Sequence, residues 1–528
     1  MLAAILGSST VFLDSTIVGV ALPKIGKELP ATIVSVLEGQ TYVVSGYLAV
    51  LAAFLILGGA LADFYGRRRI FTIGLALFGF ISVLCGLAPT LESLVLFRVL
   101  QGAAGALLVP GSLSIITATF DGAARGRAFG IWAAATSATS IVGPTFGGIL
   151  VDSVSWRVAF LINVPIIALA LYATRRYMAE TRDEDSTGSF DWLGAIVVAL
   201  GVGGLAFGAI RGQDKQWTDS LAFGALGVGA VCTVLFPILM AVRKHPLVPL
   251  ELFKSRVFTV INIATFLIYG ALYVTFGLQP LFLQGVLGYS ATAFGLLSLP
   301  TGILLTVLST RVGSVAARIG ARPFLVIGPI LMGLALMWYA RVPVTSEPWL
   351  ARIDDLGSIV PPWSMIVDIL PGVVLFGIGI SLVVAPLTTT LMGSIPVRNA
   401  GIGSAINNAI SRVGAPLLYP IIFIVISGSF YASLAAQVAG LDPDSAQIRH
   451  DLPPLNPAAA GTSELIRQAS RVASTDAFHL AVLASAVLLF LGAAVSWFGL
   501  HPASSAAHAD AEDRPAGAGS EIPIVPGG

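Results

Sequence analysis

Two ionisable side chains, Asp14 and Arg98, lie inside long apolar runs of this sequence. A charged group within such a run is costly unless it is paired or hydrated, so it is a functional candidate by default. At 1.5 Å per helical residue, Asp14 would lie about 12 Å before the end of its run, and Arg98 about 8 Å after the start of its own. The two are expected at similar depth, where Asp14 could bind and release a proton under the control of Arg98. A static pair that ties two helices together is the alternative.

A second concentration of charge follows the apolar run at 41–61. The residues of interest there are Gly59, Asp63, Gly66, Arg67 and Arg68, and Arg69 comes next. A carboxylate at such a turn can cap the next helix or pair with an arginine. The arginines could instead serve only as anchors that fix the orientation of the neighbouring helices.

A cluster of small residues marks the run at 128–150, with Gly143, Pro144, Gly147 and Gly148 in sequence. Gly143 and Gly147 have the four-residue spacing that lets two helices approach closely. Pro144 removes a backbone hydrogen-bond donor and can kink a helix. Helix packing alone could explain this pattern, and a gating role is the alternative.

An aromatic stripe runs along one face of the predicted helix at 257–283. The candidate cavity residues are Phe266, Tyr269, Tyr273 and Phe276 with Asn262 on the same helix, and Arg412 in a later run. Such a stripe usually packs against lipid or another helix. Aromatic walls with few polar groups also suit bulky apolar or cationic ligands.

The composition places all of these residues in a membrane protein. The chain has 528 residues, of which 56% are hydrophobic and 11% charged, whereas a soluble domain carries roughly 25% charged residues. The net charge of +1 leaves no basic surplus for nucleic acid. No phosphate-cradling glycine loop or cysteine-rich metal motif occurs in the sequence, so no cofactor or metal is expected.

Fourteen apolar runs are long enough to cross a membrane, and they lack the alternation of barrel strands. The predicted spans are 1–22, 41–61, 71–87, 93–114, 128–150, 158–174, 191–210, 220–242, 257–283, 292–310, 323–340, 364–391, 402–428 and 476–500. Charged segments bracket the seventh and eighth spans and predict an all-α protein with a 6 + 2 + 6 division. The predicted parts are a six-helix bundle at 1–175, a linker with two further helices at 176–255, a second six-helix bundle at 256–500 and a disordered cytoplasmic tail at 501–528.

Basic residues are denser in the loops that follow the even-numbered spans. The positive-inside rule then places both termini in the cytoplasm of a multi-pass protein of the cell membrane. The segment at 429–475 is expected on the outside as a solvated loop with short helices.

Taken in order, the segments Leu13 to Val18, Gly59 to Arg69, Arg98 to Gly102 and Gly143 to Gly148 resemble those of the major facilitator superfamily, and within it the 14-span drug:proton antiporter family. The resemblance implies two related six-helix domains around a central pathway, working as a monomer with protons and a small-molecule substrate. It also implies that Asp63, Gly66 and Arg67 belong to a conformational-switch loop, that Arg98 is linked to the proton, and that Gly143 and Pro144 begin the antiporter motif.

The predicted function is therefore proton-coupled export of hydrophobic or cationic drugs by alternating access. A dedicated exporter of an endogenous metabolite or lipid is the alternative. An enzyme is disfavoured, because the only candidate acid pair, Asp442 and Asp444, lies in a proline-rich loop without a catalytic partner. A channel is disfavoured because no filter-like repeat occurs.

Overall fold

The computed structural model describes residues 1–119, 122–181, 191–395, 400–459 and 461–500. Within these ranges the chain forms helices and no strand, and thirteen helical segments are long and apolar enough to cross a membrane. The remaining predicted span, at 128–150, falls within a further helix of 32 residues that packs along the first. The all-α membrane architecture is thereby confirmed, and the predicted tail at 501–528 lies outside the described residues.

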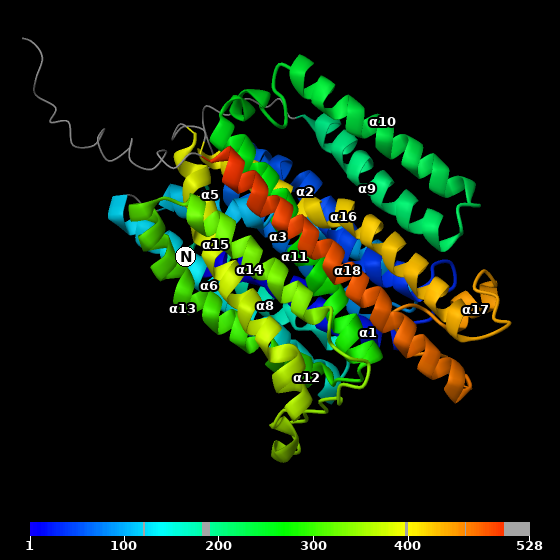
Figure 1. The fold of residues 1–528 in the computed structure, drawn as a ribbon. Helices are drawn as coiled ribbons and strands as arrows, with labels where there is room; N and C mark the ends of the chain where they lie inside the picture. The colour runs from blue at the N-terminus through cyan, green and yellow to red at the C-terminus, as the bar shows by residue number, and fades with distance from the viewer. Residues whose placement is uncertain (120–121, 182–190, 396–399, 460, 501–528) are drawn as a thin grey trace, which may run out of the picture.

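The first part of the chain is a bundle of packed helices (Figure 1). Its described members are α1 (Leu2–Glu28), α2 (Val36–Tyr65), α3 (Arg67–Gly86), α4 (Leu91–Ala106), α5 (Val109–Thr119), α6 (Gly122–Ser153), α7 (Val158–Leu161) and α8 (Asn163–Tyr177). The sequence marks several of the helix ends. Ser35 and Glu38 form a reciprocal cap at the start of α2. Pro110 has no N–H to donate to the carbonyl of Ala106, so the crossing that contains α4 and α5 is interrupted there.

A helix hairpin follows, built from α9 (Trp192–Asp214) and α10 (Ser220–Val242), and it lies on one flank of the molecule (Figure 1). The two helices pack closely through glycines, since a Cβ built on Gly204 would lie 2.9 Å from the Cα of Gly229. Arg211 Nε donates to Asp219 Oδ2 at 2.6 Å across the turn. The pKa of Asp219 is lowered, first by the N–H of Leu221 and then by Arg211. The other face of α9 packs on both α2 and α16.

The second bundle contains the remaining helices. These are α11 (Arg256–Pro280), α12 (Ala291–Leu297), α13 (Leu299–Ile319), α14 (Arg322–Tyr339), α15 (Leu370–Gly393), α16 (Ala400–Gln437), α17 (Ala446–Asp451) and α18 (Glu464–Gly499). A π-helical turn continues α11 over Leu281–Val286, another precedes α15 at Met365–Ile369, and 3₁₀ turns occupy Leu250–Lys254 and Leu356–Ile359.

The segment predicted as a loop at 429–475 is shorter in the structure than expected. Helix α16 continues to Gln437, and α18 already begins at Glu464 behind a cap in which Ser463 Oγ accepts from Ile466 N. The first turns of α18 contain charged residues, so the apolar run begins later than the helix does. The intervening chain is partly buried, with Leu455 fully enclosed.

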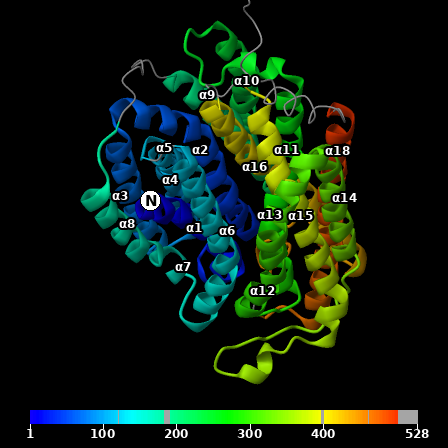
Figure 2. The same ribbon diagram turned by 90° about the vertical axis from the view of Figure 1, so that its left-hand side faces the viewer.

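Figure 2 shows the first bundle, in blue and cyan, beside the second bundle, in green to red. We call the face with the α2–α3 turn the proximal face, and the face with the α1–α2 connection the distal face. Hydrogen bonds join the two bundles towards the distal face. Thr145 Oγ1 donates to the carbonyl of Gly295 at 2.9 Å, and Asp152 Oδ2 accepts from the N–H and hydroxyl of Thr292 at 2.7 and 2.8 Å. The bundles are thus held together at the distal end.

Candidate functional site

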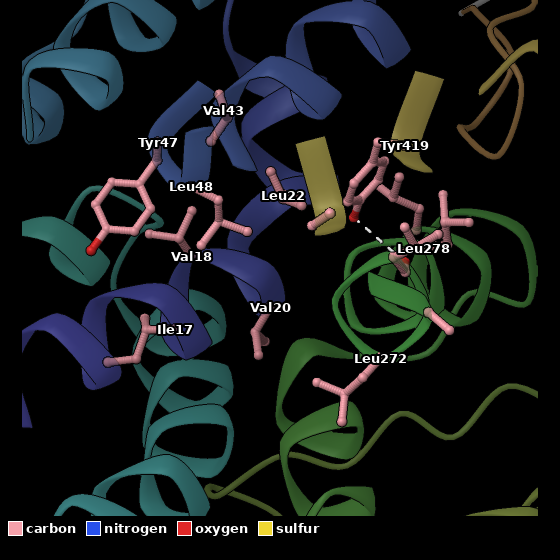
Figure 3. Packing of buried hydrophobic residues seen from close by; sticks show 14 of the residues in the cluster. Ile17, Val18, Val20, Leu22, Val43, Tyr47, Leu48, Leu272, Leu278 and Tyr419 are labelled. Atoms are coloured by element: carbon pink, nitrogen blue, oxygen red, sulfur yellow. Dashed lines mark hydrogen bonds between the residues drawn. The ribbon is translucent and has the colours of Figure 1, made fainter. Parts of the chain in front are cut away.

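A cavity of about 360 Å³ lies between the two bundles, within the size range of small-molecule sites. Its walls come from α1, α2, α4 and α6 on one side and from α11 to α16 on the other. Val20 of α1 and Leu272 of α11, both on the wall, belong to the apolar packing at this junction (Figure 3). Among the described lining residues there is no Asp or Glu, and the charged side chains are Arg98 and Arg412.

Four of the six residues predicted for the cavity reach it. Tyr269, Tyr273 and Phe276 line the wall formed by α11, and Tyr269 and Tyr273 have ring centroids 6.3 Å apart. Phe276 packs against Phe376 of α15 with centroids 6.0 Å apart. The helical spacing of the aromatic stripe therefore brings most of its rings to one surface. Arg412 is the fourth.

Asn262 and Phe266 do not line the cavity. Asn262 is buried and donates to the carbonyl of Phe258 at 2.8 Å, while it accepts from Asn407 Nδ2 at 3.1 Å. It therefore ties α11 to α16. Phe266 is partly buried against the hydrophobic core. These two residues lie nearer the start of α11 than the cavity does, which the spacing of the stripe alone did not reveal.

Asp14 lies at the centre of a buried polar cluster in the first bundle. Arg98 Nη1 donates to Asp14 Oδ2, so the two charges form an ion pair. Asp14 Oδ1 accepts from Asn163 Nδ2 at 2.9 Å and from Gln101 Nε2 at 3.1 Å. Ser82 Oγ accepts from both of these amides, at 2.8 Å from Gln101 and 3.2 Å from Asn163. Four helices, α1, α3, α4 and α8, thus converge on one carboxylate with 0% exposure.

Arg98 separates this cluster from the cavity. It lines the cavity wall, whereas Asp14 does not. Its guanidinium lies over the ring of Tyr47 at 4.0 Å, and its Nε donates to the carbonyl of Val43 at 3.2 Å. The guanidinium also donates to Gln101 Oε1 at 2.7 Å. A molecule in the cavity would therefore contact the arginine and not the carboxylate.

Apart from Arg98, the residues of the cluster around Asp14 were not among the predicted site residues. Gln101 follows Arg98 by three residues and therefore shares its helix face, which is a signal that the sequence does contain. Ser82 and Asn163 are neutral polar residues in other spans. Burying a neutral polar side chain costs little free energy at many places within a bundle, so such a residue does not stand out. Only the packing of α8 against both α1 and α3 shows that Asn163 donates to Asp14 and that Ser82 accepts from the amides around it.

Arg412 faces the cavity from α16 and is 4% exposed. Its guanidinium carbon lies 5.6 Å from the centre of the Phe12 ring. Its Nε is buried without a hydrogen-bond partner, and no carboxylate among the described residues pairs with it. Arg412 thus differs from Arg98, the other arginine of the wall, which forms an ion pair with Asp14.

The predicted switch loop is a tight turn between α2 and α3. Gly66 has φ of +105°, and a Cβ at this position would also lie 2.6 Å from Glu180 Oε1. The carboxylate of Glu180 accepts from the N–H groups of Arg68 and Arg69 at 3.0 and 3.1 Å, and so caps α3. Glu180 belongs to a charged segment more than 100 residues away, and nothing in the sequence pairs it with this turn.

The other residues of this segment contribute differently. Arg67 N donates to the carbonyl of Thr181 at 2.9 Å, and Arg68 Nη2 donates to the carbonyl of Arg175 at 3.0 Å. A Cβ on Gly59 would make an ordinary contact of 3.4 Å with Pro110. Asp63 belongs to the last turns of α2, and its side chain lies outside the described part of the structure.

The glycine motif of α6 serves two interfaces. Gly143 and Gly147 face α1, where a Cβ on Gly147 would lie 3.0 Å from a methyl carbon of Ile17. Gly148 instead faces α12 of the second bundle, and its Cβ would lie 2.7 Å from the backbone carbon of Ala291. Pro144, the fourth predicted motif residue, lines the cavity. The motif therefore packs α6 against α1 within the first bundle and against α12 of the second bundle.

Two helix bundles that enclose a central cavity, with an ion pair at its wall, define a membrane transporter. A family model of the Major Facilitator Superfamily matches residues 4–418, and the chain belongs to that family. This confirms the family resemblance. Because the family and its relatives are transporters, the prediction that the chain is not an enzyme also holds.

Similar proteins include resistance and export proteins of bacteria. The chain is 33% identical over 457 residues to multidrug resistance protein Stp of Mycobacterium tuberculosis (strain CDC 1551 / Oshkosh). This alignment covers 86% of this chain and 80% of that protein. It is 30% identical over 470 residues to the tetracenomycin C resistance and export protein of Streptomyces glaucescens, with 88% and 80% covered.

Solved structures of transporters share the fold. A bacterial homologue of the human lysosomal transporter Spinster aligns with a TM-score of 0.60 at 16% identity, covering 94% of this chain and 95% of that one. The D-xylose-proton symporter aligns with a TM-score of 0.59 at 13% identity, covering 96% and 98%. At such identities the likeness concerns the fold alone.

Proposed function

We propose that this protein exports hydrophobic small molecules, including drugs, across the cell membrane in exchange for protons. The distal face would lie outside and both termini in the cytoplasm, as the distribution of basic residues predicts. The protein would work as a monomer, with the bundles at 1–175 and 256–500 moving relative to one another around the cavity. Relatives named for multidrug resistance support a drug substrate.

The observation that carries the proposal is the contact between Asp14 and Arg98 at the cavity wall. A buried carboxylate that is ionised needs its cation and its hydrogen-bond donors, and here it has both. Protonation of Asp14 would remove the charge that holds Arg98, leaving the guanidinium free to turn towards the cavity. Proton binding on one side and substrate binding on the other would then be coupled through one side chain.

Alternating access also requires that the pathway be closed on one side of the membrane, and the contacts at the distal end would provide that closure. Gly148 and Gly295 let α6 and α12 approach closely there, and Asp152 and Thr292 join the same helices. We assign this arrangement to the state that is closed to the outside. Opening it would require α6 to separate from α12, and the switch loop around Gly66 would stabilise the opposite state at the proximal face.

The test is proton movement in proteoliposomes that contain a pH-sensitive dye and hold an imposed pH gradient. Ethidium, tetraphenylphosphonium, a neutral hydrophobic dye and the anion 1-naphthaleneacetate are added in turn. We expect proton flux on addition of a substrate with the wild type and none with Asp14→Asn. The matched control is Asp476→Asn, an exposed carboxylate on α18. Unchanged substrate-triggered flux in Asp14→Asn would exclude this role for Asp14.

A dedicated exporter is the second candidate function, and one observation favours it. A relative that covers most of this chain is named for resistance to and export of a single compound, tetracenomycin C. A correctly folded protein that moves protons in response to no member of the panel would favour a dedicated exporter of a metabolite or lipid.

A further inference from the structure

Arg412 is a buried cation on the wall of the central cavity that has no anionic partner among the described residues. An arginine in this environment normally pairs with a carboxylate or with backbone carbonyls, because desolvating an unpaired charge is costly. The ring of Phe12, 5.6 Å from the guanidinium carbon, provides a cation–π contact but no charge neutralisation.

The position of Arg412 excludes a role as a topology anchor. It lies about 18 Å along α16 from the first residue of that helix, at 1.5 Å per residue, whereas anchoring arginines lie at the membrane surface. The side chain is also nine-tenths or more buried within the protein and faces the cavity rather than lipid or water. What it can contact is therefore whatever occupies the cavity.

The rest of the cavity wall supports a ligand that is mostly apolar. Tyr269, Tyr273 and Phe276 provide aromatic surface. Arg98, the other charged residue of the wall, is already neutralised by Asp14. The cavity thus combines a hydrophobic interior with one positive charge that is not compensated, and this arrangement repels a cationic ligand and attracts an acidic one.

We propose that Arg412 binds an anionic group of the substrate, so that the preferred ligands are hydrophobic acids bearing a carboxylate, sulfonate or acidic phenol beside an aromatic ring. The inference rests on the proposed function, in that it takes the cavity to be the substrate site. It differs from the sequence-based expectation of hydrophobic or cationic drugs. The guanidinium can form two parallel hydrogen bonds with a carboxylate, and Phe12 would then stack beneath the bound pair.

The experiment measures binding to the purified full-length protein by isothermal titration calorimetry. The probes share one ring system and differ in charge: 1-naphthaleneacetate is anionic, 1-naphthaleneacetamide neutral and 1-naphthylmethylammonium cationic. We expect the wild type to bind the anion at least about tenfold more tightly than the amide, and the cation most weakly. In Arg412→Gln this preference should fall to about twofold or less, with the affinity for the amide nearly unchanged.

Two further variants separate ligand binding from a structural role. Arg412→Lys retains the charge and should keep a reduced preference for the anion. Phe12→Asp places a carboxylate beside the guanidinium, which should abolish the preference although Arg412 is still present. Arg311→Gln, an exposed arginine on α13 that does not line the cavity, is the matched control and should bind like the wild type.

Equal affinity of the wild type for the three probes, or no binding of any, would overturn the proposal. A preference for the anion that persists in both Arg412→Gln and Phe12→Asp would overturn it too. Because the measurement is of binding, it does not depend on proton coupling. If Asp14→Asn still moves protons, the proposed mechanism of coupling fails while the charge preference at Arg412 can still be observed.

Discussion

Gln40 and Asn456, 416 residues apart in the sequence, exchange two side-chain hydrogen bonds of 3.0 Å. Gln40 lies near the start of α2 in the first bundle, and Asn456 lies in the segment between α17 and α18 of the second. Gln40 also donates to the carbonyl of Leu22 at 2.9 Å. Both amides are buried, so this pair closes the distal end of the molecule with a polar contact shielded from water.

Replacing Gln40 with Ala should loosen this closure. The substitution leaves the buried amide of Asn456 without its partner, at a cost of about 1–3 kcal/mol in the closed state. We expect faster labelling of a cysteine at Val20, on the cavity wall, by an impermeant maleimide added outside cells, in a background that carries Cys232→Ser. Gln447→Ala is the control, because Gln447 bonds to Asp451 within α17. Equal labelling rates would show that the pair does not hold this end closed.

Gly148→Ala should disturb the same closure through packing. The added Cβ would lie 2.7 Å from the backbone carbon of Ala291 and 3.0 Å from the Cα of Thr292, and these backbone atoms cannot move aside as a side chain can. We expect initial export rates to fall by about tenfold or more. Gly428→Ala should leave the rate unchanged, since no atom lies within 4 Å of its Cβ. Full activity of Gly148→Ala would mean that α6 and α12 need not approach this closely.

Glu180→Ala should weaken the start of α3. The carboxylate accepts from the N–H groups of Arg68 and Arg69, and losing such a cap costs about 0.5–2 kcal/mol. Hydrogen exchange should quicken at the first amides of α3 and stay unchanged in α8. Glu251→Ala, at an exposed glutamate, is the comparison. If exchange in α3 did not change, the Glu180 contact would contribute nothing to the turn.

Asn163→Ala should destabilise the first bundle. Asn163 donates to Asp14 at 2.9 Å, and the substitution removes one of the donors that a buried carboxylate needs, at a cost of about 1–3 kcal/mol in the free energy of unfolding. We expect a lower midpoint of thermal unfolding for the purified protein. Asn408→Ala is the control, because this amide donates to the carbonyl of Ser404 on its own helix. An unchanged unfolding midpoint in Asn163→Ala would show that this hydrogen bond contributes nothing to stability.

The sequence determined the class of fold because the cost of burying backbone polar groups in lipid leaves long apolar runs only one solution, the helix. The same cost made Asp14 and Arg98 conspicuous, and their depth along their runs followed from the rise of a helix. The four-residue spacing of Gly143 and Gly147 likewise indicated close helix packing, but it did not identify the helix against which they pack.

The tertiary structure decided which residues meet. Neutral polar residues such as Ser82 and Asn163 carry no sequence signal that distinguishes a member of the Asp14 cluster from any other buried hydroxyl or amide. Asn262 belongs to the same helix as the aromatic stripe, yet it bonds to α16 instead of facing the cavity. Arg412 and Arg98 are alike in sequence as arginines within apolar runs, and only the packing of the helices gives one a carboxylate and leaves the other without one. Pairing of side chains depends on how helices pack around one another, and that arrangement is set by contacts between segments hundreds of residues apart.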